Sequence, residues 1–172
     1  TGPKAGGPLY LYRLLCSRPE DAVINTLAHH DSGQLQNVSG REALQTAHHA
    51  LIKWADEQQQ PVVAQLARRY GELAQGGTVR VLPGPTGERN TYALLPRERI
   101  LCLADTEADA LTQLAAVLAI GSEVLWPEST VQSDLFRTLP AVVKSRITLT
   151  KDWQTAHIHF DGVIYHGDAD QL

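Results

Sequence analysis

Short apolar strands alternate with amphipathic helices in the second half of the chain, and this alternation restricts the fold more than any other feature. The apolar run Arg99–Ala104 precedes a helical pattern from about Glu107 to Ile120, which Gly121 ends. Three more strands and one more helix are predicted, at Glu123–Trp126, Ser129–Leu139 (the helix), Arg146–Thr150 and Gly162–Tyr165. Such alternation is typical of a parallel sheet built from βαβ units. We therefore predict an α/β fold in which residues 97–172 form the first part of an incomplete, degenerate Rossmann-like domain.

Helical patterns dominate the part of the chain before this alternation. Residues 1–18 are predicted to be a tail and linker, because Gly and Pro are concentrated in the first eight residues. Residues 19–77 are predicted to form a helical connector with a helix at Pro19–His29. Ser39 and Glu42 fit a capping box for a second helix, whose apolar face holds Leu44, Ala47, Leu51, Trp54 and Ala55. A third helix starts at Pro61 and is predicted to stop at Gly76–Gly77, with an apolar face of Val63, Leu66, Ala67, Tyr70 and Ala74.

The hydrophobic period changes between the helices and the Rossmann-like part. Thr78–Leu82 alternates between apolar and polar residues, Pro83–Gly87 has turn composition, and Asn90–Leu95 can return as a second strand. Residues 78–96 are therefore predicted to form a β-hairpin arm.

Composition excludes several classes of protein. The chain carries 15 Lys and Arg against 19 Asp and Glu, for a net charge of -4, without a basic cluster, so we expect no nucleic-acid partner. No apolar run is long enough to span a bilayer, and no signal peptide is evident at the start. Cys16 and Cys102 form neither a C-x-x-C pair nor a disulfide scaffold, which favours reduced thiols and a cytoplasmic location.

The chain contains no Met and begins at Thr1. At its other end, Asp168 is predicted to cap a helix of which only the first turn is present. Both features favour an internal piece of a longer protein.

Catalytic and cofactor motifs are missing from the sequence. The Gly-rich opening around Lys4 and the segment Pro83–Gly87 fit neither G-x-x-x-x-G-K-[ST] nor G-x-G-x-x-G, and no G-x-S-x-G elbow occurs. Cys102 lies in a predicted buried strand, where a thiol is inert. The carboxylates near strand and helix ends fit caps and solvated groups better than acid/base pairs: Glu107, Asp109, Glu123 and Glu128. We assign no catalytic and no cofactor-binding residue.

Histidines suggest one metal alternative. His157, His159 and Asp161 alternate, so on a strand they would face one side, with His166 and Asp168 nearby in sequence. The competing interpretation is a solvated surface loop, because no Cys or Glu completes a usual zinc spacing. The adjacent pairs His29–His30 and His48–His49 point in different directions on helices. A metal-binding regulatory module stays an alternative, with no metal ligand assigned.

Four strings resemble the bacterial proline utilization A family. Thr1–Arg13 resembles the end of its glutamate semialdehyde dehydrogenase domain. Three others resemble the C-terminal domain of its long members: Gly84–Tyr92, Leu94–Ala104 and Phe160–Asp168. The resemblance implies a bifunctional or trifunctional enzyme in which an FAD-dependent proline dehydrogenase and an NAD-dependent glutamate semialdehyde dehydrogenase oxidise proline to glutamate.

For this segment the resemblance implies a non-catalytic lid that docks on other domains of the same polypeptide and supports substrate channelling. It implies FAD and NAD for the longer protein and no cofactor here. A homo-oligomer and peripheral membrane association are possible properties of the longer protein. In aldehyde dehydrogenases the second strand of this unit ends in Lys-Pro-x-Glu, whereas here Trp126 precedes Pro127 and no Lys is present. The alternative is a dehydrogenase domain that still binds NAD.

Two regions are candidate docking surfaces. One is the hairpin 78–95, and the other is the set of apolar helix faces that contain Leu44, Leu51, Trp54, Leu66 and Tyr70. The alternative for the helix faces is that they complete the internal core, which is the commoner use of an apolar face.

Overall fold

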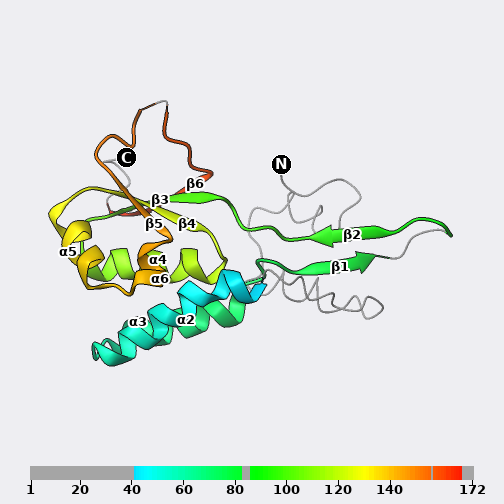
Figure 1. Cartoon of the computed structure of the whole chain (residues 1–172), viewed down its shortest axis with the longest axis horizontal. Coiled ribbons are helices and arrows are strands. Elements are labelled where there is room, and N and C mark those ends of the chain that lie inside the picture. The colour runs from blue at the N-terminus through cyan, green and yellow to red at the C-terminus, as the bar shows by residue number, and fades with distance from the viewer. Residues whose placement is uncertain (1–40, 83–85, 156, 168–172) are drawn as a thin grey trace.

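The computed structural model describes residues 41–82, 86–155 and 157–167 (Figure 1). Two helices come first, then a hairpin, then an α/β unit. The elements are α2 (Arg41–Glu57), α3 (Pro61–Leu73), β1 (Val79–Leu82), β2 (Asn90–Ala93), β3 (Arg99–Ala104), α4 (Glu107–Ala119), β4 (Glu123–Pro127), α5 (Thr130–Thr138), α6 (Ala141–Lys144), β5 (Ile147–Thr150) and β6 (Gly162–His166). The predicted helix Pro19–His29 and the capping residue Ser39 lie outside the described residues.

Four strands form one parallel sheet in the order β5-β4-β3-β6. The chain starts at β3, moves outward to β4 and β5, and then returns to the other side of β3 to place β6. This is the 3-2-1-4 order with which a Rossmann sheet begins. The predicted α/β class and partial Rossmann-like sheet are confirmed, and the strand bounds agree to within one residue at each end.

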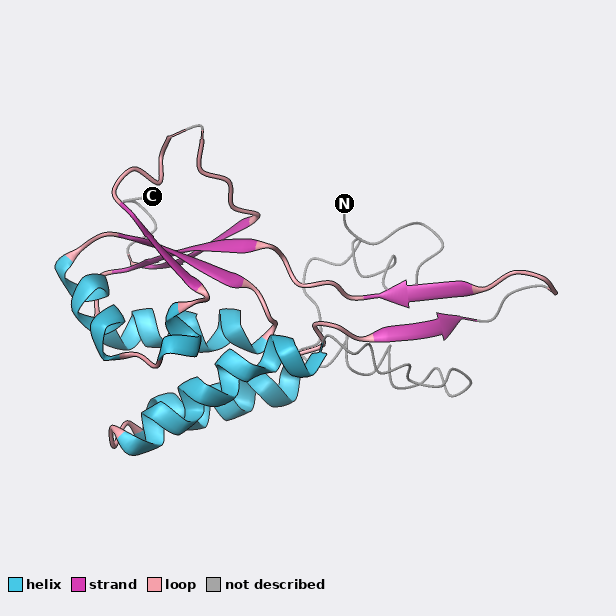
Figure 2. Ribbon diagram, viewed as in Figure 1, coloured by secondary structure: helices cyan, strands magenta, loops and turns pink. Residues whose placement is uncertain are grey.

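All described helices lie on one side of this sheet (Figure 2). Alternate residues of the strands face them, as expected from the two-residue period of a strand. Buried side chains from the sheet and from α4 form the centre of one hydrophobic core: Ile100, Cys102, Val124, Trp126, Leu111, Leu114 and Leu118. The described residues of the connection from β5 to β6, 151–155 and 157–161, lie on the opposite side of the sheet (Figure 1).

The two N-terminal helices belong to the same core. Leu51 and Trp54 of α2 and Ala67 of α3 are buried in the cluster that contains the sheet residues. The Trp54 indole N–H also donates to the carbonyl of Thr138, at 3.0 Å. The prediction that the faces of Leu51 and Trp54 are docking surfaces is therefore wrong, because these side chains pack against α4 and its neighbours within the chain.

The other residues of that docking prediction are less buried than Leu51 and Trp54 or lie outside the described side chains. Leu66 and Tyr70 are half-buried, with Tyr70 packed against the same core. The side chain of Leu44 lies outside the described part of the structure.

The end of α3 comes earlier than predicted. The helix stops at Leu73, and Ala74 has extended backbone angles while its N–H donates to the Tyr70 carbonyl. Gly76 and Gly77 follow in the connection to β1 and have other roles: a Cβ at Gly76 would collide with the carbonyl oxygen of Ile120, and Gly77 has a φ of 77°. Glycine is required here by a close approach of two backbones and by a left-handed conformation.

The hairpin is confirmed as an antiparallel pair, with Val79 opposite Ala93 and Leu82 opposite Asn90. It forms a two-stranded sheet of its own that extends away from the α/β unit (Figure 2). Its base is fixed by hydrogen bonds from Gly77 N–H to Leu94 O and from Leu94 N–H to Thr78 O, at 2.7 and 2.9 Å. Within the part of the chain that the structure describes, no helix is long and apolar enough to cross a bilayer.

Candidate functional site

Open α/β sheets usually bind ligands at the carboxyl ends of their strands. Here that edge holds a crevice of about 420 Å³ between the end of β3, the end of β4 and the start of α5. Its wall consists of Leu103, Ala104, Asp105, Pro127, Ser129, Thr130, Val131 and Gln132. In a Rossmann domain this is the place where a dinucleotide would lie, so its chemistry tests the NAD alternative.

The turn from β3 to α4 has an acidic character. Thr106 caps α4: the Asp109 N–H donates to Thr106 Oγ1 at 3.2 Å, and the Thr106 hydroxyl donates to Asp109 Oδ2 at 2.7 Å. Glu107 and Asp109 occupy the first turn of the helix, next to Asp105. The positive end of the helix dipole is therefore already matched by carboxylates. A phosphate at this position would meet negative charge and a capped helix end without glycines.

Two glutamine side chains donate hydrogen bonds to backbone carbonyl groups at the carboxyl ends of the strands. Gln132 is buried, and its side-chain amide donates to the Ala104 carbonyl at 2.7 Å. Ser129 caps α5 and contacts both the backbone N–H and the side-chain oxygen of Gln132. This arrangement joins the end of β3 to the start of α5 and explains why Gln132 is buried although it is polar.

A second buried glutamine, on α4, joins the neighbouring strands β3 and β6. Gln113 Nε2 donates to the Leu103 carbonyl at 2.8 Å and to the Ile164 carbonyl at 3.3 Å, and it lies 2.8 Å from His166 Nδ1. The amide therefore connects β3 to β6 at the switch point of the sheet. His166 is held as a structural partner there.

Trp126 stands directly before Pro127, where the aldehyde dehydrogenase pattern Lys-Pro-x-Glu has its Lys. The Trp126 side chain is fully buried in the core on the helix side of β4. It therefore offers the crevice neither a cation nor a hydrogen-bond donor. Among the described residues, the crevice has neither a glycine-rich phosphate loop nor a Lys or Arg in its wall, so its residues do not fit a dinucleotide.

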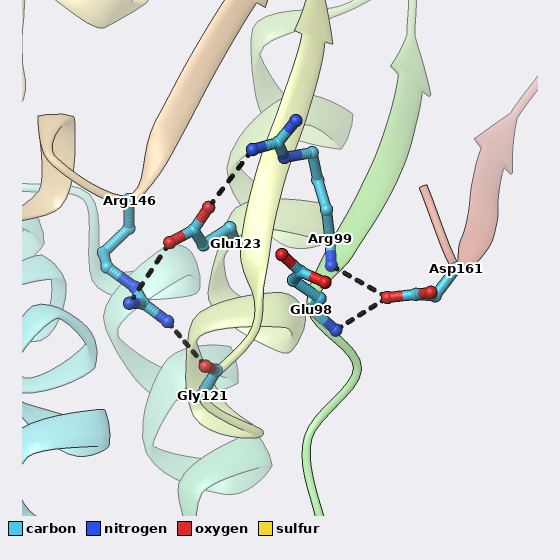
Figure 3. Close-up of polar contacts among 6 residues, drawn as sticks. All are labelled: Glu98, Arg99, Gly121, Glu123, Arg146 and Asp161. Carbon is cyan, nitrogen blue, oxygen red and sulfur yellow. Dashed lines mark hydrogen bonds and ion pairs between the residues drawn. The ribbon is translucent and has the colours of Figure 1, made fainter. Parts of the chain in front are cut away.

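The amino ends of the strands, opposite the crevice, carry the polar contacts drawn in Figure 3. Glu123, at the start of β4, lies between two cations, with its oxygens 3.6 Å from Arg99 Nη2 and 3.5 Å from Arg146 Nη1 (Figure 3). Arg146 also donates from Nη2 to the Gly121 carbonyl at 2.6 Å. These half-buried contacts connect the starts of β3, β4 and β5, which makes them a structural clamp.

Asp161 makes the equivalent connection to β6. One of its oxygens accepts from the backbone N–H of Glu98 and of Arg99, at 2.7 and 3.1 Å (Figure 3). These two hydrogen bonds lower the pKa of the Asp161 carboxyl, and the one from the Arg99 N–H has the larger effect. The positive charge of Arg97 also lowers this pKa. This oxygen, Oδ2, holds β3, so a metal ion in the His157, His159 and Asp161 alternative would have to share the carboxylate with these two backbone hydrogen bonds.

The two histidines of that alternative are both exposed. Within the described residues, no three His, Cys, Asp or Glu side chains lie together as a metal ion requires. Asp168 lies outside the described residues.

The cysteine of β3 is buried and inert. Burial raises the pKa of the Cys102 thiol to about 12, so it is fully protonated near neutral pH. Its Sγ lies 3.7 Å from the Ile100 carbonyl. The expectation that Cys102 lies in a buried strand is confirmed, whereas Cys16 lies outside the described part.

Curated proteins match the chain along its whole length. It is 56% identical over 172 residues to the bifunctional protein PutA of Escherichia coli (strain K12) and 56% identical to that of Klebsiella aerogenes. The PutA protein of Rhizobium meliloti is 36% identical over the same 172 residues. This chain is a PutA-type segment. The resemblance to the proline utilization A family is therefore confirmed, although no protein-family model matches the chain.

The matched share of each relative is small. All 172 residues of the chain align, but they span only 13% of the length of each PutA relative. What the whole relatives do is therefore a matter of proposal for this chain.

The sequence analysis did not identify the polar residues that connect the strands at the carboxyl and amino ends of the PutA-type sheet. Gln113 and Gln132 were not singled out, although each lies among apolar residues on the buried side of a helix, which is the available signal. The clamp of Arg99, Glu123 and Arg146 had no such signal. Its partners are brought together only by the order of the strands.

Proposed function

We propose that this chain is a non-catalytic docking segment of a longer PutA-type polypeptide. In that polypeptide, an FAD-dependent proline dehydrogenase would oxidise proline, and an NAD-dependent glutamate semialdehyde dehydrogenase would oxidise the product to glutamate. The segment would act as a lid that helps retain the intermediate between the two active sites. Its partners would be other domains of the same polypeptide.

One observation carries the non-catalytic part of this proposal. The crevice where a Rossmann domain would hold its dinucleotide is lined by apolar residues, by neutral Ser, Thr and Gln side chains and by one carboxylate, Asp105. Trp126 lies in the core at the position of the usual Lys. A dinucleotide carries negative charge on its phosphates, and this crevice offers no opposite charge. Together with the inert thiol of Cys102, this favours packing over chemistry as the role of the segment.

The hairpin supports the docking part. It extends from the α/β unit and exposes most residues of β2. A two-stranded sheet without a hydrophobic partner is marginal in water, so packing of the arm against another domain would stabilise it. The proposed arrangement would be cytoplasmic, with homo-oligomerisation or membrane association belonging to the longer polypeptide.

Coupled turnover in the complete polypeptide tests the proposal. Deleting residues 41–172, which keeps Thr1–Arg13 with the dehydrogenase domain whose end it resembles, should leave proline oxidation and the oxidation of added glutamate semialdehyde close to normal when each is assayed alone. NADH formation from proline should then show a lag, because the intermediate escapes. Immediate NADH formation without a lag in the deleted protein contradicts the docking role, provided both separate activities are present.

Nicotinamide binding tests the alternative. Isothermal titration of the segment with NAD should give no saturable heat. Saturable binding in the micromolar range, abolished by Thr130→Asp, which adds a negative charge to the crevice wall, would support the NAD-binding alternative instead.

A further inference from the structure

Asp161 and Gly162 form an Asp–Gly pair at the point where the connection from β5 ends and β6 begins. No other Asp and no Asn of the sequence is followed directly by Gly. In such a pair the backbone nitrogen of Gly can attack the carboxyl carbon of Asp, because Gly has no Cβ to hinder the approach and leaves the backbone free to turn. The product is a succinimide, which water opens to aspartate or to isoaspartate. This pair therefore carries the chemistry for isoaspartate formation.

The fold does not require glycine at position 162. A Cβ added there would lie 3.4 Å from Ile100 Cδ1 and 3.8 Å from Arg97 Cδ, which is ordinary van der Waals contact. The φ of Gly162 also lies outside the left-handed range in which glycine is favoured. Gly162→Ala should therefore leave the fold intact, while its Cβ hinders the attack on Asp161.

Asp161 is in contact with solvent but is fixed to β3. Its residue is exposed, and Gly162 is half-buried. Asp161 Oδ2 accepts from the backbone N–H of Glu98 at 2.7 Å and from that of Arg99 at 3.1 Å (Figure 3). The backbone N–H of Asp161 also donates to the Arg99 carbonyl, at 2.8 Å. Both the side chain and the backbone of Asp161 are therefore bound to the same strand.

These contacts oppose succinimide formation in two ways. Hydrogen bonds to Oδ2 stabilise the ionised carboxylate, and an ionised carboxylate resists nucleophilic attack because it has no hydroxyl group to leave as water. The same hydrogen bonds hold the carboxyl group at the backbone of β3, so it cannot turn onto the Gly162 nitrogen while they last. The reaction therefore requires that Asp161 first separates from β3 by local opening.

Isoaspartate at position 161 would weaken the pairing of β6 with β3. That pairing begins at Gly162, which lies opposite Ile100. In isoaspartate the main chain runs through the side-chain methylene, so it is longer by one carbon, and the carboxylate is attached directly to Cα. A shorter carboxylate on a displaced backbone cannot reach both of the amides that Asp161 binds.

We propose that Asp161–Gly162 is a site of spontaneous isoaspartate formation, that its hydrogen bonds to β3 suppress the reaction, and that the modification releases the start of β6. In the first step the Gly162 nitrogen forms a bond to Asp161 Cγ. One carboxyl oxygen leaves as water, with the amide proton and the proton of the neutral carboxyl group. Hydrolysis of the succinimide returns one water, so no oxidant, metal ion or second substrate is consumed. The site goes beyond the proposed docking role and is independent of it.

Peptide mapping of the complete polypeptide after incubation at pH 7 tests the site. Electron-transfer fragmentation distinguishes isoaspartate from aspartate in the peptide that contains residues 161 and 162. The folded polypeptide should form isoaspartate there more slowly than the free peptide of residues 157–167, by about tenfold or more, and urea that unfolds the segment should remove the difference. Gly162→Ala should form little isoaspartate in either state. Equal rates in the folded polypeptide and the free peptide overturn the proposal, as does a free peptide that forms none.

Two substitutions of Glu98 test the protecting hydrogen bond. Glu98→Pro removes the backbone N–H that donates to Asp161, whereas Glu98→Ala, the matched control, keeps it. Isoaspartate formation should rise by about tenfold or more in Glu98→Pro and should stay at the unmodified rate in Glu98→Ala. Equal rates in the two variants contradict the protection. The comparison of the folded polypeptide with the free peptide answers the same question without a substitution, so it still decides where proline disturbs the fold.

Limited proteolysis tests the release of β6. In the incubated polypeptide, molecules cut within residues 151–161 should contain more isoaspartate than uncut molecules, because their connection is no longer fixed to β3. Incubated Gly162→Ala gives the level of cleavage without modification. Equal isoaspartate contents in the cut and uncut fractions contradict the release.

Discussion

Trp126 provides the sharpest test of the link between the core and the proposal that the segment binds no nucleotide. Its side chain is fully buried in the cluster between the sheet and the helices. A buried Trp removes roughly 150–250 Å² from water, which corresponds to about 4–6 kcal/mol at about 25 cal/mol per Å². Because Ala keeps part of that area and leaves a cavity, Trp126→Ala should destabilise the fold by about 3–5 kcal/mol.

Urea unfolding followed by circular dichroism measures this loss. With an m-value of about 2 kcal/mol/M, the midpoint should fall by roughly 2 M. Trp126→Phe is the matched control. It keeps an aromatic ring, and the Trp126 Nε1 has no hydrogen-bond partner among the described residues, so the substitution breaks no hydrogen bond and should cost about half as much or less.

Trp126→Lys connects stability to function. It restores the residue type of the aldehyde dehydrogenase pattern but places an ammonium group in the core, so it should destabilise by several kcal/mol without creating NAD binding. Two results would refute the reasoning: a loss below about 1 kcal/mol for Trp126→Ala, or saturable NAD binding by Trp126→Lys.

Three further perturbations test other parts of the structure. His48 is buried and its Nε2 lies 2.8 Å from the Ala67 carbonyl; burial lowers its pKa from 6.5. The unfolded chain therefore binds a proton more readily, so stability should fall as the pH drops below about 6.5, and His48→Gln should flatten that dependence in thermal melts. In a Cys16→Ser variant, Cys102 should resist a thiol reagent at pH 7 until the fold opens in urea, and immediate labelling of Cys102 in the folded protein would contradict its burial. Gly76→Ala should destabilise, because the added Cβ collides with the Ile120 backbone, whereas Gly87→Ala, with open space around it, should cost only the strain of its positive φ; equal melting temperatures for the two variants would argue against that close approach.

The elements of the α/β unit could be predicted because their signals are local. The apolar run Arg99–Ala104 and the capped helix that begins at Glu107 depend on residues adjacent in sequence, and both were located to within one residue. The end of α3 is predicted too late from the sequence, because Gly76 resembles the residue that stops the helix. Gly76 instead allows a close backbone approach to Ile120, which is distant in sequence.

The helix faces and the sheet edges show a different limit. An apolar face on α2 predicts burial but not the partner, so Leu51 and Trp54 were assigned to docking although α4 covers them. The single turn α6 is too short for a periodic pattern. The absence of a Lys before Pro127 could be read from the sequence, and it led to the prediction that this segment binds no cofactor. The roles of Gln113 and Gln132 could not be predicted, because they depend on carbonyl groups that only the strand order brings near them.

The return of the chain to place β6 beside β3 has a consequence for the order of folding. The strands β3, β4 and β5 follow one another with short connections, so they can assemble with their helices as the chain leaves the ribosome. Asp161 and β6 reach β3 only across about sixty residues, the separation of the contacts to Glu98 and Arg99. Until then, the apolar strand RILCLA is itself an unprotected edge. Synthesis of β6 therefore covers this edge of β3 and shortens the period in which the nascent chain is prone to aggregation.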